Sequence, residues 1–348
     1  MEARHRISML WRIVAAIGTF VFAVSAIGQV SGIVLTDRES LREKYLWPAK
    51  IPYPKDNPYS EAKFKLGRML FFDPILSGSG SCSCASCHNP GLSWADGQPR
   101  AVGLIQEPLT LRCPTLLGVA WIPKPGWTGR FRDLESLAMT PITSPQMMNL
   151  PENLLIERLS ANSGYVAAFK DAFHETQIDR RQVEQALATF ERSILPARAP
   201  FDRWLDGGRT AINESAARGF DLFNGKANCA ACHNGWAFTD SSFHDIGSAD
   251  NDDIGRGNLF PNSVTLRYAF KTPTLRDVAR RGPYMHDGSV STLPAVIELY
   301  DRGGIDRPSR AAEIRRLGLS SIEKADLIAF LETLTGRPDI VPSPVLPR

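Results

Sequence analysis

Two short motifs combine residues that can hold a redox cofactor. Cys84-Ala-Ser-Cys87-His88 and Cys229-Ala-Ala-Cys232-His233 both read Cys-x-x-Cys-His. In this pattern the two thiols attach to the vinyl groups of a haem, and the histidine that follows becomes an iron ligand. The sequence therefore predicts two covalently bound c-type haems, with His88 and His233 as ligands of the metal.

A zinc site is the main alternative, because Cys-x-x-Cys pairs also bind zinc. The residues in and after the two copies are similar. The first copy reads Cys-Ala-Ser-Cys-His-Asn-Pro-Gly and the second reads Cys-Ala-Ala-Cys-His-Asn-Gly. Both copies also follow an apolar segment with helical spacing. This repetition favours haem, and a haem absorption band in the mature protein would eliminate zinc.

Two further cysteines, Cys82 and Cys113, lie outside the motifs. In an oxidising compartment they could form a disulfide. They could equally remain free thiols. Cys82 also lies two residues before Cys84, so it is a possible competitor in haem attachment.

Length, charge and the N-terminus limit the class of protein. The chain has 348 residues, enough for about two domains, and a net charge of +3. No basic run with interleaved aromatic residues suggests a nucleic acid partner. The first residues are positively charged, and an apolar run follows over 13–28, with Val24-Ser-Ala26 as a possible cleavage site. This pattern predicts a signal peptide over 1–26. An uncleaved anchor is the alternative, and either reading places the body in the periplasm.

A similar unit occurs twice and predicts the domain organisation. A helix over 62–72 ends at Asp73-Pro74 and leads through a Ser/Gly loop to the first motif. A second helix over 215–223, with Asn213 as N-cap, leads through Asn224-Gly225 to the second motif. We expect a mostly α fold with two cytochrome c-like domains, over 60–200 and 205–336, each with one c-type haem.

Most of the remaining chain also favours helices. Apolar residues recur at helical spacing over 152–161, 164–173 and 180–194, and Ser320 with Glu323 forms a capping box before a C-terminal helix. Strong strand alternation is absent. The linker between the domains is expected near 196–209, and the Pro-rich tail from Gly336 should be irregular.

Several segments resemble the bacterial di-haem cytochrome c peroxidases and their MauG relatives. The resemblance covers roughly residues 60–335. It rests on Leu66-Gly-Arg-Met-Leu-Phe-Phe-Asp-Pro74 with Leu76-Ser-Gly-Ser-Gly80, on Gly126-Trp-Thr-Gly-Arg130, and on Phe270-Lys-Thr-Pro-Thr-Leu-Arg276 with Pro283-Tyr-Met-His-Asp-Gly-Ser289. It implies an oxidoreductase in which the N-terminal haem takes up peroxide and the C-terminal haem stores or delivers electrons.

The resemblance also implies roles for individual residues. His88 would be the proximal ligand at the peroxide site, and His233 one of two ligands at the six-coordinate second haem. The other ligand is a methionine in the peroxidases and a tyrosine in MauG; the matching position here is Tyr300, with Met285 as its rival. Trp127 matches the tryptophan between the haems, which can relay an oxidising equivalent.

The distal side of the peroxide haem departs from the family. Leu104 takes the position of a loop histidine, Met147 that of the catalytic glutamate, and Leu137 that of a glutamine found in MauG. Peroxide cleavage needs a group that moves a proton between the two oxygens, and none of these side chains can do so.

Other polar groups nearby are the candidates that remain. Gln146 would enter the pocket if the alignment slips by one residue, and Gln106 and Glu107 follow Leu104 closely. Alternatively Met147 or Met148 ligates the first iron and closes the site. The catalytic candidates are therefore Trp127, Gln146 and Met147.

The resemblance further implies a calcium ion between the haems, which this chain disfavours. Arg112 takes the place of the asparagine ligand, and Arg281 lies at another ligand position. The implied partners are hydrogen peroxide and a donor such as a small cytochrome c or a cupredoxin, or a partner protein that is oxidised, and family members are often homodimers. The alternative function is a di-haem electron carrier or redox sensor that has lost peroxidase chemistry.

Overall fold

The computed structural model describes residues 42–104, 107–248, 252–337 and 340–347. The signal peptide predicted over 1–26 and the candidate Gln106 lie outside these residues. Residues 48–348 form one compact unit, separate from 1–47, and the fold below is that of the larger unit. Within the described ranges, no helix has both the length and the apolar character needed to cross a membrane.

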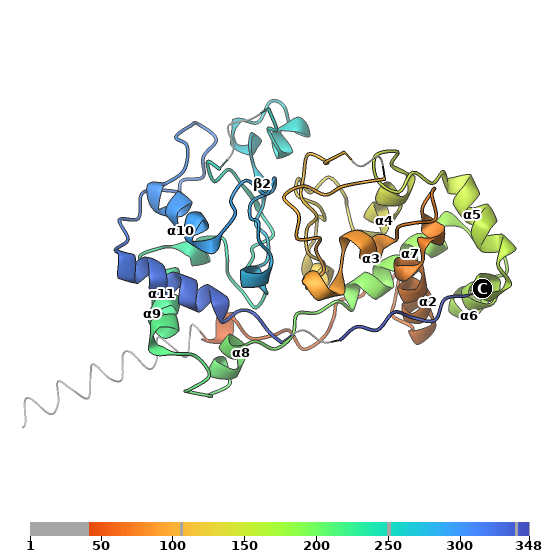
Figure 1. The fold of residues 1–348 in the computed structure, drawn as a ribbon, viewed down its shortest axis with the longest axis horizontal. Coiled ribbons are helices and arrows are strands. Elements are labelled where there is room, and N and C mark those ends of the chain that lie inside the picture. The colour runs from red at the N-terminus through yellow and green to blue at the C-terminus, as the bar shows by residue number, and fades with distance from the viewer. Residues whose placement is uncertain (1–41, 105–106, 249–251, 338–339, 348) are drawn as a thin grey trace, which may run out of the picture. The chain divides into compact units, whose positions relative to one another are not determined.

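The larger unit is mostly helical, which confirms the predicted fold class (Figure 1). Its helices are α2 (Glu61–Phe72), α3 (Cys84–Cys87), α4 (Leu134–Thr143), α5 (Glu152–Ala161), α6 (Ser163–Phe173), α7 (Arg180–Arg192), α8 (Pro200–Leu205), α9 (Glu214–Asn224), α10 (Leu293–Arg302) and α11 (Ser321–Glu332). Two short strands, β1 (Phe243–His244) and β2 (Phe270–Lys271), pair antiparallel. Short 3₁₀ turns and irregular loops connect these elements.

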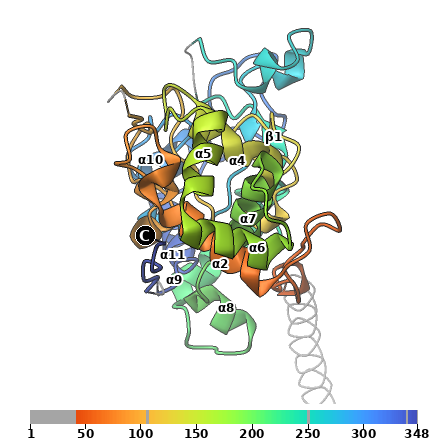
Figure 2. The ribbon, with the colours of Figure 1, turned by 90° about the vertical axis from the view of Figure 1, so that its right-hand side faces the viewer.

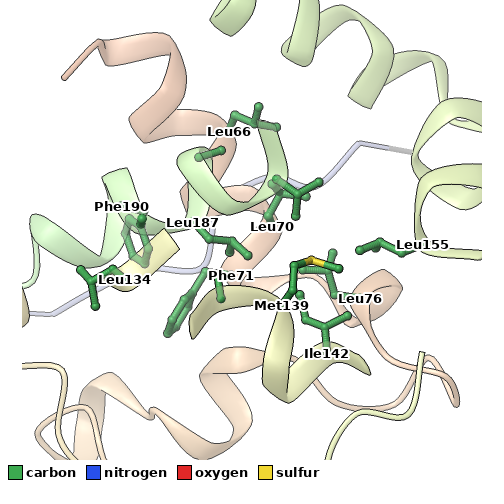
Figure 3. Packing of buried hydrophobic residues seen from close by; sticks show 14 of the residues in the cluster. Leu66, Leu70, Phe71, Leu76, Leu134, Met139, Ile142, Leu155, Leu187 and Phe190 are labelled. Atoms are coloured by element: carbon green, nitrogen blue, oxygen red, sulfur yellow. The ribbon is translucent and has the colours of Figure 1, made fainter. Parts of the chain in front are cut away.

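The first cytochrome c-like region is built on the crossing of α2 and α7. A Cβ atom on Gly67 would lie 1.9 Å from the carbonyl oxygen of Ala186, so only glycine allows the two helices to approach this closely. Figure 3 shows the buried core around this crossing, with Leu70 of α2, Leu187 of α7 and Met139 of α4 among its members. Helices α4, α5 and α6 complete this region, as the turned view in Figure 2 shows.

The second region repeats this arrangement with α9 and α11. A Cβ atom on Gly219 would lie 2.0 Å from the carbonyl oxygen of Asp326. The core here is aromatic: Phe220 and Phe223 of α9 have ring centroids 5.4 Å and 5.1 Å from that of Phe330 of α11. In each region a helix before the motif, α2 or α9, therefore crosses a helix after it, α7 or α11, with the same close approach.

Most predicted helices are present, with two differences. The N-caps Asn213 and Ser320 accept hydrogen bonds from backbone N–H groups as expected. Helix α8 lies inside the expected linker over 196–209, because Pro200 starts a short turn. Helix α4 was not predicted, since Pro141 interrupts its pattern, but a capping box from Asp133 to Ser136 begins it.

Candidate haem cavity

Both motifs open onto one cavity with a volume of about 1010 Å³. The residues that line it come from loops and helix ends of both regions. They include every site residue predicted from the sequence: Cys84, Cys87, His88, Trp127, Gln146, Met147, Cys229, Cys232, His233, Met285 and Tyr300. The fold thus brings residues more than 200 positions apart in the chain to one site.

The backbone of each motif makes the same tight turn. The N–H of His88 donates to the carbonyl of Cys84, and the N–H of His233 donates to that of Cys229, both at 2.8 Å. The first turn is helix α3, where the N–H of Ser83 donates to Ser86 Oγ. The second follows Asn228, which adopts the left-handed conformation. Each turn places its cysteines and its histidine beside the cavity.

Each motif histidine is oriented through one ring nitrogen. Nδ1 of His233 lies 3.0 Å from the carbonyl oxygen of Phe238, and Nδ1 of His88 lies 3.3 Å from that of Trp94. A hydrogen bond from Nδ1 to a carbonyl fixes the tautomer and leaves Nε2 for a metal. Burial lowers the pKa of both histidines, which favours the neutral, ligating form.

Cys113 is a free, buried thiol that contacts the His88 ring. Its Sγ lies 3.3 Å from Nδ1 and 3.8 Å from Nε2 of that ring. The Cys113 thiol is therefore a second polar neighbour of the His88 ring, besides the carbonyl of Trp94. Cys82 is also free, so of the two possibilities left open by the sequence the structure has unpaired thiols.

The two rival ligands for the second site both line the cavity. Tyr300 projects from α10, and the pKa of its hydroxyl is raised by burial and by the neighbouring side chains of Cys229 and Cys232. Met285 lies in a loop and has a left-handed backbone with φ of 70°. Tyr300 is thus placed next to the second motif. Met285 lines the same cavity from the loop in which Tyr284 and Val290 form a β-bridge.

Trp127 is half-buried and held at both backbone and side chain. Its indole Nε1 donates to the carbonyl of Arg112 at 2.9 Å. Its own carbonyl accepts from the N–H of Lys271 on β2 at 2.8 Å. Residues of the first region and of the second region therefore fix one tryptophan on the cavity wall.

The loop after the first motif packs against the segment after α4. The N–H of Leu104 donates to the carbonyl of Met147 at 3.0 Å, and Gly103 contacts the backbone of Gln146. Leu104, Leu137, Gln146 and Met147 all line the cavity, and Glu107 lies at its exposed edge. Besides Gln146 and Glu107, the polar side chains on this part of the wall are hydroxyl groups such as those of Thr140 and Ser144.

The residues at the expected calcium position do not fit a calcium ion. Calcium takes six to eight oxygen ligands, usually with carboxylates among them. Here the buried guanidinium of Arg112 donates to the carbonyl of Arg281 at 2.9 Å, and Arg281 donates to the carbonyls of Arg276 and Thr274. Arginine donors already use carbonyl oxygens that a cation would need.

Comparison with known proteins identifies the family. Residues 61–210 match the family model of di-haem cytochrome c peroxidase, and residues 216–335 match that of cytochrome c. Over 313 residues the chain is 50% identical to the methylamine utilization protein MauG of Methylorubrum extorquens, across 89% of each chain. The chain belongs to the di-haem cytochrome c peroxidase/MauG family. It is therefore an oxidoreductase of that type, as the sequence motifs predict.

Other relatives agree with this membership. The cytochrome c551 peroxidase of Nitrosomonas europaea is 32% identical over 305 residues, which cover 86% of each chain. A solved structure of a MauG-like protein associated with microbial copper homeostasis has a TM-score of 0.77 and 29% identity, covering 84% of this chain and 96% of that one. The similarity extends over both cytochrome c-like regions.

Membership in a di-haem family implies two c-type haems, and the cavity fits that implication. It carries two cysteine pairs and two neutral, Nδ1-anchored histidines. Cys232, Asp240 and His244 also bring three possible metal-ligating atoms within 4.8 Å of one another. Since Cys232 belongs to the second motif, we assign it to haem attachment and read the Asp240–His244 pair, 2.8 Å apart, as structural.

Sequence reasoning missed two buried charged residues on the cavity wall, Glu191 and Lys271. Glu191 at the end of α7 is buried, and one of its carboxyl oxygens has no partner. Its position four residues after Leu187 and eight after Val183 places it on the apolar face, which was a detectable signal. Lys271 on β2 is also buried, and burial lowers its pKa to about 8; a two-residue strand gave no pattern to reveal it.

Proposed function

We propose that this chain is a periplasmic di-haem enzyme that reduces peroxide with electrons from a donor, or uses the oxidising power of peroxide on a partner protein. The observation that carries the proposal is the single cavity that joins both motifs, with Trp127 on its wall. The reaction is balanced when one hydrogen peroxide accepts two electrons and two protons and yields two waters. The bound haems would supply the redox chemistry, while the chain supplies ligands, orientation and electrostatics.

We assign the ligands as the motifs suggest. His88 would serve the N-terminal site that takes up peroxide, and His233 with Tyr300 the C-terminal site, with Met285 as the alternative to Tyr300. The closeness of Tyr300 to the cysteines of the second motif supports this choice. An anionic tyrosinate would stabilise oxidised iron more than a thioether does.

Trp127 is the residue we propose to carry electrons between the two motif sites. The hydrogen bond from its indole to the Arg112 carbonyl holds the side chain in one orientation, and the bond from the Lys271 N–H to the Trp127 carbonyl fixes its backbone. A fixed orientation suits electron transfer, because the aromatic side chain then needs no rearrangement when its charge changes. This role depends on both domains, which we place at 60–200 and 205–336.

Proton transfer at the proposed peroxide site is the step for which the chain offers the fewest suitable groups. The wall formed by Leu104, Leu137 and Met147 offers no titrating group. Gln146 can orient peroxide through hydrogen bonds but cannot accept a proton, and Glu107 is a solvent-exposed acid at the edge of the cavity. We infer that Gln146 positions the oxidant and that protons enter from solvent beside Glu107.

The apolar wall also supports a second function, in which the first haem does not react with peroxide. If Met147 ligates the first iron, the site is closed to peroxide, and the protein is an electron carrier or a redox sensor. The hydrogen bond between Leu104 and Met147 holds the methionine segment over the cavity, which supports this alternative.

Spectra of the mature di-haem protein, taken before and after one equivalent of hydrogen peroxide, test the two functions. We expect one high-spin and one low-spin haem, and a peroxide-induced change that disappears when a reduced small cytochrome c or cupredoxin is added. Two low-spin haems that do not respond to peroxide would contradict the proposed enzyme and favour the carrier.

A further inference from the structure

Two buried guanidinium groups, Arg112 and Arg281, lie where the two motif regions meet. They are 7% and 8% exposed. Both line the cavity, and Arg112 Nη2 donates to the carbonyl of Arg281 at 2.9 Å. Arg281 itself donates through Nε to the carbonyl of Arg276 at 3.0 Å and through Nη2 to that of Thr274. Two positive charges are thus buried together and contact neutral carbonyl groups.

The carboxylates near this pair are engaged elsewhere. Asp277 accepts from Ser93 Oγ and from the N–H of Gly336, each at 3.1 Å. Asp96 accepts from the N–H of Gln98 at 3.0 Å. Among the described residues, none forms an ion pair with Arg112 or Arg281 within 4.0 Å. The charges of Asp96 and Asp277 still act on Arg112 and Arg281, but from beyond ion-pair distance. Two buried cations without a direct ion-pair partner therefore favour an additional anion from outside the chain.

Two buried polar atoms without a hydrogen-bond partner support the same conclusion. Arg112 Nε and His286 Nε2 are buried without a partner. Both residues line the cavity. The backbone N–H of Arg112 donates to the carbonyl of His286 at 2.9 Å, so the two residues lie on adjacent backbone segments. The carbonyl of Arg112 accepts from the Trp127 indole, so this cluster is at the centre of the site.

Burial lowers the pKa of both guanidinium groups, but arginine side chains stay protonated at neutral pH. Burial, with the charge of Arg112 adding to it, lowers the pKa of Arg281 to about 10. At neutral pH Arg281 therefore stays protonated. Two fixed cations and a further N–H donor form a site for a carboxylate, because guanidinium groups match carboxylates in geometry as well as charge.

We propose that Arg112 and Arg281 bind a propionate carboxylate of a haem, and that their fixed charges take the place of a metal ion between the two haem sites. This inference rests on the presence of both haems and not on peroxide turnover. The cations keep the propionate ionised and raise the reduction potential of the haem that carries it. They also couple that carboxylate to the backbone that holds Trp127.

Spectroelectrochemical titration of the mature protein and its Arg112→Gln variant tests the proposal. Loss of one buried positive charge should lower one of the two midpoint potentials. We expect the reduced-to-oxidised ratio at a fixed applied potential to fall by about tenfold, which is about 59 mV for a one-electron couple. Since the propionate loses its partner, its pKa should rise, and the potential should become pH-dependent. The Arg112→Lys variant keeps the charge and should stay near wild type.

Controls separate this effect from general damage and from other ions. Arg132→Gln removes an arginine whose side chain is 85% exposed, and it should leave both potentials unchanged. Unchanged potentials in Arg112→Gln would overturn the proposal. Wild-type potentials that depend on acetate or chloride concentration would assign the site to a free anion instead, and potentials that respond to added calcium or a chelator would overturn the replacement of a metal. If Arg112→Gln fails to mature, Arg281→Lys and Arg281→Gln provide the same comparison.

Discussion

At the scale of single residues, the cavity wall combines the cysteines and histidines of the two motifs with other side chains that change the electrostatics around them. The sequence predicts the motif cysteines and histidines as a group because covalent haem attachment would dictate their spacing, and the structure places them on one cavity. Cys113 and Glu191 could not be predicted as readily. Their positions beside His88 and beside Cys84 depend on how α7 and the loop after the first motif pack, which no local pattern encodes.

Glu191 should make stability depend on pH. Burial raises its pKa to about 8, with Arg192 opposing that shift and Glu135 adding to it. Between about pH 4.3 and pH 8 the unfolded state releases this proton and the native state keeps it, so stability falls as pH rises. Glu191→Gln should match wild type near pH 4 and be more stable by about 3 kcal/mol at pH 7. Chemical denaturation of the mature protein across this range measures the difference.

A matched substitution serves as reference for that experiment. Glu157→Gln changes an exposed glutamate on α5 and should leave the pH dependence as in wild type. Equal stability of wild type and Glu191→Gln at pH 7 would show that the Glu191 carboxyl finds a partner in the mature protein.

The missing acid at the peroxide site also leads to a prediction for one residue. If the apolar wall limits turnover, Met147→Glu should raise the rate of peroxide reduction, with an upper range of about 10²–10⁴. Met147→Gln introduces a polar group that cannot transfer a proton and should show little gain. Stopped-flow mixing with peroxide measures both. No gain from Met147→Glu would mean that another group already handles the proton.

At the scale of elements, each cytochrome c-like region depends on one close helix crossing. Helix positions were largely predictable, because apolar spacing and caps such as Asn213 act locally. The crossing itself was not, since it depends on Gly67 meeting Ala186 more than a hundred residues away. Helix α4 was missed for the opposite reason: Pro141 breaks its local pattern, and contacts with α7 hold it in place.

Gly67→Ala should therefore destabilise the first region. The added methyl would lie 1.9 Å from a backbone oxygen that cannot move without separating α2 from α7. We expect a loss of about 1–3 kcal/mol or more in the free energy of unfolding. Gly91→Ala is the control, because its nearest neighbour is the side-chain oxygen of Asn89 at 3.2 Å. A Gly67→Ala protein as stable as this control would refute the role of the crossing.

The buried ion pair between Asp202 of α8 and Arg276 should contribute more to stability than the exposed ion pair between Arg198 and Asp206. Both side chains are 1% exposed, with Arg276 Nη1 at 2.8 Å from Asp202 Oδ1. Asp202→Asn leaves a buried guanidinium without its counter-charge and should cost about 3–5 kcal/mol. Asp206→Asn disrupts the exposed pair with Arg198 and should cost at most about 1 kcal/mol. Thermal unfolding of the two variants gives the comparison, and similar melting temperatures would contradict it.

At the scale of the whole molecule, the proposed function requires electron transfer between the two regions, and Trp127 is the residue we propose for it. Trp127→Phe should slow peroxide-dependent oxidation of the donor by roughly tenfold or more, a loss of about 1.4 kcal/mol or greater in transition-state stabilisation. The spectra of the two haems should stay unchanged, which would exclude a purely structural effect. Trp121→Phe alters an indole that packs edge-on against Trp236 and should keep the wild-type rate. Equal rates in the two variants would remove Trp127 from the electron path.

The shared cavity has a consequence for how the protein is made. Because one hollow of about 1010 Å³ serves both motifs, the haems are part of the interior that holds the two halves together. A chain that has received only one haem would leave half of that interior open, with leucine and valine side chains in contact with water. We therefore expect a chain with only one haem to be cut faster by a protease than the chain with both, which limited proteolysis of the two forms would measure.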